Sequence, residues 1–386
     1  MRDKFQSVAS WDLESQATLH PRGHRRAGRS PCARAVGLCA VAVAAALAAA
    51  AAAHSAPAQR LQAPQPSEIA RADAAIPDTI SRARAASLAV PSGSWGGTYR
   101  AFTGESVTVY ASNVYPVDPA IGQRWADFLA TLVHGSEISS VIVFLAPDTQ
   151  ISRLCGSDAV ACYSSQDNLL IAPGDDPAAN LSAEAVVTHE YGHHVAAHRS
   201  NAPWDALDYG TKRWASSTQV CARARKGELA PGAEDPVQYE VNPGEGFAET
   251  YRVLNERKAG RAETPWQIVS DILYPNDAAL AALELDVTTP WQSDTTTAST
   301  VRFTRATRTR TFNVSTPLDG SLKVTVRPAA GTKLTVDVFA ASKRVAHAAA
   351  AGVVARSTTV CGQRSYRIRV HALKGNGSFS LAVAKP

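Results

Sequence analysis

The chain has 386 residues, 45% of them hydrophobic, which is enough for two domains with separate cores. The formal net charge of +5 conceals two oppositely charged parts: residues 88–295 carry 13 basic and 26 acidic side chains, whereas residues 296–386 carry 15 basic and 2 acidic ones. Neither a nucleic-acid recognition motif nor a series of stacking aromatic residues accompanies the basic charge, so we expect no nucleic-acid partner.

Residues 1–55 have the pattern of a signal peptide with a long n-region. An apolar run at 36–53 follows the basic stretch PRGHRRAGRSPCAR, and small residues around Ser55 and Ala58 suit cleavage. The run is also marginally long enough to span a membrane, so a retained N-terminal anchor is the alternative. We favour cleavage and secretion, because an alanine-dominated run is only weakly hydrophobic. Residues 56–87, rich in Ala, Pro, Gln and Arg, fit a linker or short pro-segment.

Strand and helix patterns mix in the part that follows. The sequence predicts strands at 106–112 (SVTVYAS), 139–147 (SSVIVFLAP) and 168–173 (NLLIAP), and an amphipathic helix at 119–135. We expect the last of these strands to have a free edge, which can pair with the extended backbone of another chain.

An H-E-x-x-H pattern lies in the stretch VVTHEYGHHVAAH, for which Ser182 is a suitable helix N-cap. On a helix, His189 and His193 lie one turn apart on the same face and can bind one zinc ion. Glu190 is offset round the helix, so it is placed to act as a general base on water at the metal. Gly192 offers room for another segment or the metal to approach closely. The alternative is a solvated polar helix, since short patterns recur by chance.

A second helix is predicted in YEVNPGEGFAETYRVLNE. Asn242 suits its N-cap and Pro243 its first position, which places Glu245 and Glu249 one turn apart on one face. The apolar residues around them indicate a packed helix, where two acids are costly without charged partners. Zinc bound by Glu245, with Glu249 accepting a hydrogen bond from a ligand histidine, satisfies both acids. The alternative is a surface helix with acids near its positive end.

Helical patterns also dominate the rest of this part. They cover residues 205–225, 244–257 and a segment around 266–285.

The HEYGH motif, followed some fifty residues later by the E-G-F-A-E helix, resembles the gluzincin metallopeptidases. Carried over by position, this resemblance implies that His189, His193 and Glu245 bind one zinc ion per chain. It implies Glu190 as the general base and Glu249 as the hydrogen-bond partner of a ligand histidine. The metzincins fit less well, because no G-x-x-H follows His193 at their spacing.

Residues 296–386 have the pattern of a small antiparallel β-sandwich. Alternating segments such as SLKVTVRP, KLTVDVFAA and SYRIRVHALKG are separated by turn residues. The segment SYRIRVHALKGNGSFSLAV resembles the pre-peptidase C-terminal domains of secreted bacterial peptidases. The basic charge suits an anionic cell-surface polysaccharide. Docking on the acidic part of the chain, or simple solvation, are the alternatives.

Four cysteines lie beyond the predicted signal segment, an even number that suits an oxidising compartment. Cys155 and Cys162 can staple a short loop, and Cys221 and Cys361 can tie the two parts together, although the sequence does not fix this connectivity. The absence of a C-x-x-C pattern disfavours a cysteine zinc site.

Taken together, the sequence predicts an α+β chain with a zincin-like catalytic domain at 88–295 and a β-sandwich at 296–386. We expect a secreted zinc metallopeptidase that acts on peptides or proteins. Tyr239, His194 and His198 are candidates for stabilising the oxyanion, with Tyr239 preferred because it precedes the second helix. A zinc hydrolase with a non-peptide substrate, and a noncatalytic surface-binding protein with structural zinc, are the rival functions.

Overall fold

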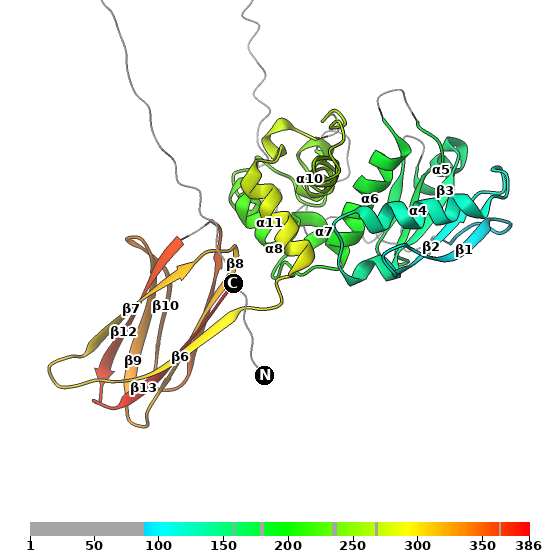
Figure 1. The fold of residues 1–386 in the computed structure, drawn as a ribbon. Helices are drawn as coiled ribbons and strands as arrows, with labels where there is room; N and C mark the ends of the chain where they lie inside the picture. Colours follow the sequence, from blue (N-terminus) through cyan, green and yellow to red (C-terminus); the bar gives the residue numbers. More distant parts are fainter. Residues whose placement is uncertain (1–88, 157–158, 178–180, 234–237, 267–268, 363) are drawn as a thin grey trace, which may run out of the picture. The chain divides into compact units, whose positions relative to one another are not determined.

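The computed structural model describes residues 89–156, 159–177, 181–233, 238–266, 269–362 and 364–386 (Figure 1). The predicted signal segment and the predicted linker at 56–87 lie outside the described residues. Within the described ranges, none of the helices has both the length and the apolar character that a membrane span requires. The chain is of mixed α and β structure and ends in two packed β-sheets, as the predicted class requires.

A five-stranded sheet with the order β1-β2-β3-β5-β4 opens the described chain. Its strands are β1 (Trp95–Arg100), β2 (Ser106–Ala111), β3 (Ile142–Ala146), β4 (Cys162–Ser164) and β5 (Leu169–Pro173). The three central strands are parallel, and β1 and β4 pair antiparallel at the two sides. The predicted strands correspond to β2, β3 and β5.

The prediction of a free edge at 168–173 is wrong. β5 lies between β3 and β4, so both of its sides are paired. The chain returns after the helix α5 (Asp148–Cys155) and places the three residues of β4 antiparallel to β5, with the Cys155–Cys162 disulfide closing the returning segment. Within the described residues, the sheet edge on this side is β4.

Three of the helical segments lie between strands of this sheet in the chain, and the others follow β5. The helical segments are α4 (Pro119–Thr131), η1 (Ser136–Ser140), α5 (Asp148–Cys155), α6 (Ala183–Ala197), α7 (Ala206–Tyr209), α8 (Lys212–Ser217), α9 (Val220–Ala224), η2 (Tyr239–Val241), α10 (Pro243–Lys258), η3 (Asp271–Leu273) and α11 (Asp277–Thr288). The helices α4 and α6 lie beside the sheet, and α8, α10 and α11 lie beyond α6 (Figure 1). The predicted helical region 205–225 consists of three short helices, because Gly210 and Gln219 take positive φ angles of 73° and 61° between them. The predicted segment at 266–285 contains η3 and most of α11, which begins after the N-cap Asn276 and continues three residues further, to Thr288.

The helices α6 and α10 pack closely together, and both begin where the sequence predicts. The Ser182 side chain accepts a hydrogen bond from the Ala185 backbone at the start of α6, and Asn242 caps α10. A Cβ atom added at Gly192 would lie 2.9 Å from the Ala248 Cα atom. The expectation that Gly192 admits another segment is therefore confirmed, and that segment is α10.

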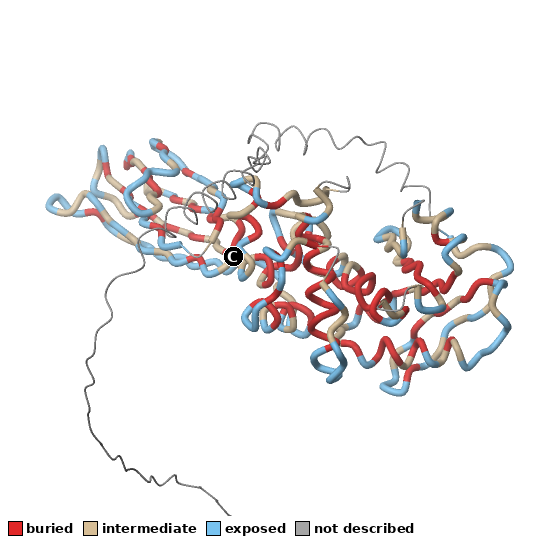
Figure 2. Tube along the Cα trace, turned by 90° about the horizontal axis from the view of Figure 1, so that it is seen from above, coloured by how far each residue is buried: buried red, intermediate tan, exposed pale blue. Residues whose placement is uncertain are grey.

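The C-terminal part is a β-sandwich. Its strands are β6 (Thr295–Arg302), β7 (Thr309–Thr316), β8 (Gly320–Pro328), β9 (Lys333–Ala340), β10 (Lys343–Ala350), β11 (Val354–Val360), β12 (Arg364–Lys374) and β13 (Ser378–Lys385). They form one sheet with the order β10-β9-β12-β7 and another with the order β11-β8-β13-β6. Buried side chains of both sheets share one apolar core, and buried and exposed positions alternate along the strands (Figure 2). The predicted sandwich is confirmed.

Two disulfides join the expected cysteine pairs. Cys155 bonds to Cys162, and Cys221 on α9 bonds to Cys361, which follows β11. The Asp319 backbone N–H also donates to the Ser216 hydroxyl over 2.9 Å. The C-terminal sandwich is therefore covalently attached to the helical region at a second point besides the main chain.

Candidate metal centre

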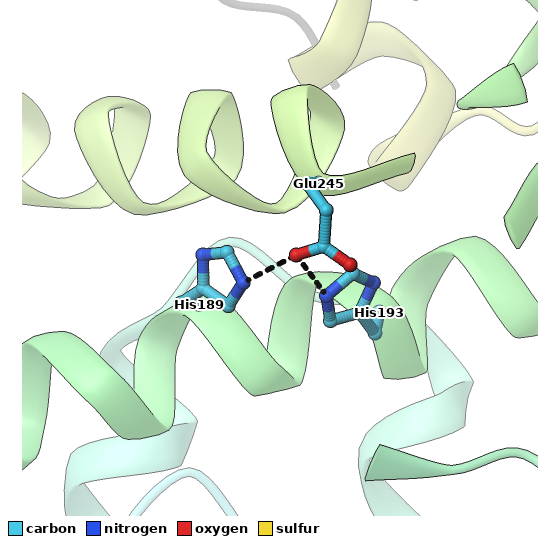
Figure 3. Close-up of side chains that lie close together, drawn as sticks. All are labelled: His189, His193 and Glu245. Atoms are coloured by element: carbon cyan, nitrogen blue, oxygen red, sulfur yellow. Dashed lines mark hydrogen bonds and ion pairs between the residues drawn. The ribbon is translucent and has the colours of Figure 1, made fainter. Parts of the chain in front are cut away.

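Two histidines of α6 and one glutamate of α10 face one another (Figure 3). The Nε2 atoms of His189 and His193 each lie 3.3 Å from the same carboxylate oxygen, Oε2 of Glu245. One candidate ligand atom from each residue lies within 4.8 Å of the other two. Two atoms bound to one tetrahedral zinc ion are separated by about 3.4 Å, so the spacing of these donors fits zinc.

The exposure of the three side chains differs. The His189 side chain is 9% exposed, whereas the side chains of His193 and Glu245 are each 14% exposed. One side of the group is therefore accessible to solvent, and an ion held there can also meet a ligand from outside. The types of donor also fit zinc, because two imidazoles and one carboxylate are a common set of zinc ligands.

Glu249 lies where the sequence analysis expects it. The Nδ1–H group of His189 donates to Glu249 Oε1 over 2.9 Å, which leaves Nε2 directed towards Glu245. This bond fixes the tautomer and the ring orientation of a ligand histidine. Glu249 is itself only 5% exposed, so it needs a compensating charge.

Arg252 supplies that charge. Its Nε atom donates to both oxygens of Glu249 over 3.2 and 3.1 Å, and its Nη1 atom donates to Glu256 Oε2 over 2.6 Å. The backbone N–H and the hydroxyl of Thr264 donate to Glu256 over 3.0 and 2.6 Å. A continuous chain of hydrogen bonds thus runs from His189 to the segment after α10. Arg252 and Glu256 were not predicted as site residues, although their spacings of three and seven residues from Glu249 place them on its side of the helix.

The electrostatics of the group favour a cation between the acids. Burial lowers the pKa of His189, but hydrogen bonds to Glu245 and Glu249 outweigh burial and raise it to about 10. Burial raises the pKa of Glu249, but His189 and Arg252 outweigh it and lower it to about 2. The pKa of Glu245 lies well below its usual value, since the two histidines outweigh its burial. The acids around His189 therefore favour positive charge at its ring.

Glu190 and Tyr239 lie beside the three candidate ligands. Glu190 follows His189 on α6 and is 8% exposed, and its charge raises the pKa of both His189 and Tyr239. The Tyr239 hydroxyl donates to Glu245 Oε2 over 2.7 Å, while burial and the neighbouring acids raise its pKa. Tyr239, predicted as an oxyanion donor, therefore contacts the glutamate of the site.

His194 and His198 are engaged elsewhere. His194 is fully buried, donates from Nε2 to the Glu137 carbonyl over 2.9 Å and accepts at Nδ1 from the Tyr163 hydroxyl over 2.9 Å. Nδ1 of His198 donates to the His194 carbonyl over 2.9 Å. His194 lies about 100° round the helix from His193, so its side chain is directed away from the candidate ligands. Through Tyr163 it ties the edge strand β4 to α6.

Comparison with known proteins gives little further information. No family model matches the chain, and no curated protein matches it. One solved structure that matches is the pre-peptidase C-terminal domain of a collagenase from Bacillus anthracis, with 19% identity over 22% of this chain and 87% of that chain, at a TM-score of 0.20. The Yersinia pseudotuberculosis-derived mitogen matches with 7% identity over 24% of this chain and 87% of its own, at a TM-score of 0.21.

A third match is PliG from Aeromonas hydrophila, a periplasmic inhibitor of g-type lysozyme, with 13% identity over 24% of this chain and 85% of that chain, at a TM-score of 0.18. These TM-scores are low. The description of the C-terminal part as a β-sandwich therefore rests on its own strand pairing.

Proposed function

We propose that the chain is an exported zinc-dependent metallopeptidase with a gluzincin-like catalytic domain. The observation that carries this proposal is the meeting of His189, His193 and Glu245 within 4.8 Å, with Glu190 next to His189 on the same helix. A purely structural zinc site is usually closed by a fourth protein ligand. Among the described residues, the group contains three candidate ligands, which leaves one position for water or substrate.

Each residue of the site has a defined task in peptide hydrolysis. Zinc, when bound, polarises the scissile carbonyl and lowers the pKa of water towards about 7. The Glu190 carboxylate accepts a proton from the attacking water and transfers it to the nitrogen of the leaving amine as the C–N bond breaks. Glu249 keeps His189 oriented. Tyr239 holds Glu245 and is our candidate donor to a developing oxyanion.

The strand β4 is the proposed binding element for an extended peptide. It is the sheet edge beside α6 in the described chain, and the Tyr163–His194 hydrogen bond of 2.9 Å fixes it to that helix. Edge strands offer unpaired backbone groups that an extended substrate can pair with.

Export is supported by the disulfides. Such bonds persist in oxidising compartments and are rare in the cytosol, so the pairs Cys155–Cys162 and Cys221–Cys361 agree with the secretion that the sequence predicts.

The test combines metal analysis with cleavage of a peptide library derived from a denatured proteome. The purified protein should contain about one zinc per chain and generate new peptide termini that a chelator suppresses. His193→Ala should lose the zinc, whereas Glu190→Gln should keep it and lose turnover by roughly 10²-fold or more.

Other results would favour the rival functions. A zinc-loaded protein that cleaves no peptide would indicate either a non-peptide substrate or a structural zinc site. Near-normal turnover by metal-loaded Glu190→Gln would remove Glu190 from the mechanism.

A further inference from the structure

The exposed charged side chains of the sandwich are basic, and none of them is acidic. Residues 296–386 contain 15 Lys and Arg side chains, and the only acids among them are Asp319 and Asp337. Both acids are buried, at 2% and 3% exposure. The accessible surface of this part is therefore positive, with no exposed acidic side chain to offset it.

Several cations gather on the outer face of the sheet β10-β9-β12-β7. Strand pairing places Arg344 opposite Phe339, and Phe339 opposite Arg367, in one row across three strands. The next row contains His347, Asp337 and Arg369 in the same order of strands. We call these six residues the arginine face. The side chains of Arg344 and Arg369 are 54% and 47% exposed, so both are accessible from solvent.

The guanidinium groups on this face are held in place by the two central side chains. Asp337 accepts from Arg344 over 3.2 Å, from His347 over 2.7 Å and from Arg369 over 3.0 Å. The guanidinium carbons of Arg367 and Arg369 lie 5.1 and 5.0 Å from the centre of the Phe339 ring. The three arginines and the one aspartate of this face give a net charge of +2, with His347 counted as neutral. The cations are thus ordered before any partner arrives, which lowers the entropic cost of binding.

We propose that the arginine face binds a polysaccharide that carries carboxylate groups. Guanidinium groups match carboxylates in shape and charge and donate paired hydrogen bonds to them. Arg344 and Arg367 lie two strands apart, which separates their backbones by about 10 Å and suits a polymer with repeated charges.

Single-stranded nucleic acid fits this face less well. Such binding requires a series of aromatic side chains on which successive bases stack. On the arginine face the one aromatic residue is Phe339, and two guanidinium groups already contact its ring. The surface thus offers charge and hydrogen-bond donors but no series of stacking platforms.

The experiment measures binding of the purified protein to polygalacturonate, with neutral dextran and oligo(dT) as comparison polymers. Binding to polygalacturonate should be tighter than to oligo(dT), undetectable with dextran, and should weaken steeply as salt rises, because charges are screened beyond about 8 Å at physiological ionic strength. Arg344→Gln combined with Arg367→Gln should weaken binding about five- to tenfold. This variant removes the Arg344 bond to Asp337 but leaves two of the three partners of the buried acid, Arg369 and His347, in place.

A matched control removes the same charge from the other sheet. Lys323 and Arg327 are exposed on β8, and Lys323→Gln combined with Arg327→Gln should change the affinity less than twofold. His193→Ala should also bind normally, because His193 lies on α6 and the arginine face lies on β9, β10 and β12. Absence of binding, equal loss in both double variants, or tighter binding of oligo(dT) would each overturn the proposal.

Discussion

Arg252 links the two acids of α10 that would otherwise be buried without compensation. Its side chain is 2% exposed and forms ion pairs with Glu249, one turn earlier in the helix, and with Glu256, one turn later. Removing one member of a buried ion pair leaves an uncompensated charge at a cost of about 3–5 kcal/mol, which is larger than the effect of most surface changes. Glu249 can therefore stay ionised next to His189 because Arg252 neutralises part of its charge.

The role of Glu249 gives the first prediction. Glu249→Gln should weaken zinc affinity by roughly 10- to 100-fold, since an amide accepts a weaker hydrogen bond from the His189 ring. Competition with a chromogenic chelator measures this affinity. Glu256→Gln is the comparison, because it leaves the Glu249–His189 bond in place and should change the affinity less. Equal affinities for wild type and Glu249→Gln would mean that Glu249 does not orient the histidine.

At the residue scale, most residues of the candidate metal site could be predicted from the sequence. His189, His193 and Glu245 were identifiable because helix geometry converts their spacings directly into positions on a face. Arg252 was not, because its importance depends on burial, and burial follows from packing of α10 that no local pattern records. The bond from Tyr239 to Glu245 was missed for the same reason, since the loop before α10 has no repeating geometry.

The contact between α6 and α10 depends on one glycine. The space at Gly192 is filled by α10, where the Ala248 carbonyl and the Tyr251 Cβ atom lie 3.2 Å from an added Cβ. A larger side chain must therefore push apart the two helices that hold the candidate ligands.

Gly192→Val should thus destabilise the protein by about 2 kcal/mol or more, since overpacking of a core typically costs 1–3 kcal/mol and exceeds the small gain in helix propensity. Zinc affinity should fall as well, because Glu245 moves with α10. Chemical denaturation and metal titration measure the two effects. Gly352→Val is the control, because an added Cβ there meets nothing within 4 Å. A normal midpoint for Gly192→Val would show that the helices can separate freely.

A buried ion pair fixes η1 to the end of α6. The Arg199 Nη2 atom donates to Glu137 Oε2 over 2.8 Å, and Arg199 also donates to the carbonyls of Asp286 and Val287 at the end of α11. Burial raises the pKa of Glu137, but Arg199 and the Gly135 backbone N–H outweigh it and hold the pKa below the usual value of 4.5.

Because the pKa of Glu137 is lowered in the folded state, the protein should lose stability as the pH falls. Below pH 4.5 the unfolded state takes up a proton at Glu137 before the folded state does, so the pair's stabilisation is present above pH 4.5 and is lost as the pH falls. Denaturant midpoints measured from pH 6 to about pH 3 should fall less steeply for Glu137→Gln than for wild type. Glu184→Gln is the control, since its pair with Arg261 is exposed and contributes little. Parallel curves for Glu137→Gln and wild type would contradict this assignment.

At the element scale, the missed strands have identifiable causes. β10 (KRVAHAAA) is rich in alanine, which has a low β-propensity, and β11 (VARSTTV) has few apolar residues at alternate positions. β4 has three residues and depends on β5 for its conformation. The strands with clear alternation, such as β8 and β12, were predicted because period-two burial is visible in the sequence.

At the scale of the whole molecule, the two disulfides close loops of very different length. The pair Cys155–Cys162 spans 7 residues, whereas Cys221–Cys361 spans 140. In the chain-entropy description, closing such loops stabilises the folded state by about 2 and about 5 kcal/mol.

Replacing Cys221 and Cys361 by serine should therefore lower the free energy of unfolding more than replacing Cys155 and Cys162. Chemical denaturation of the two double variants, followed by tryptophan fluorescence and circular dichroism, compares them directly. The opposite order would mean that the short loop next to β4 contributes through the folded state rather than through chain entropy.

The unequal distribution of charge between the two parts of the chain was visible in the sequence, but which of the charged side chains are exposed was not. Counting gives a net charge of −13 for residues 88–295 (13 basic, 26 acidic) and +13 for residues 296–386 (15 basic, 2 acidic). The burial of Asp319 and Asp337, which leaves residues 296–386 without an exposed acidic side chain, appears only in the folded chain.

The Cys221–Cys361 bond also changes what a backbone cut can do. Any peptidase that cleaves between these cysteines produces two polypeptides still joined through sulfur. Such a nicked molecule keeps its mass in a non-reducing gel and separates into fragments only after a thiol is added. The basic sandwich would then stay joined to the helical region after such a cut, until the disulfide is reduced.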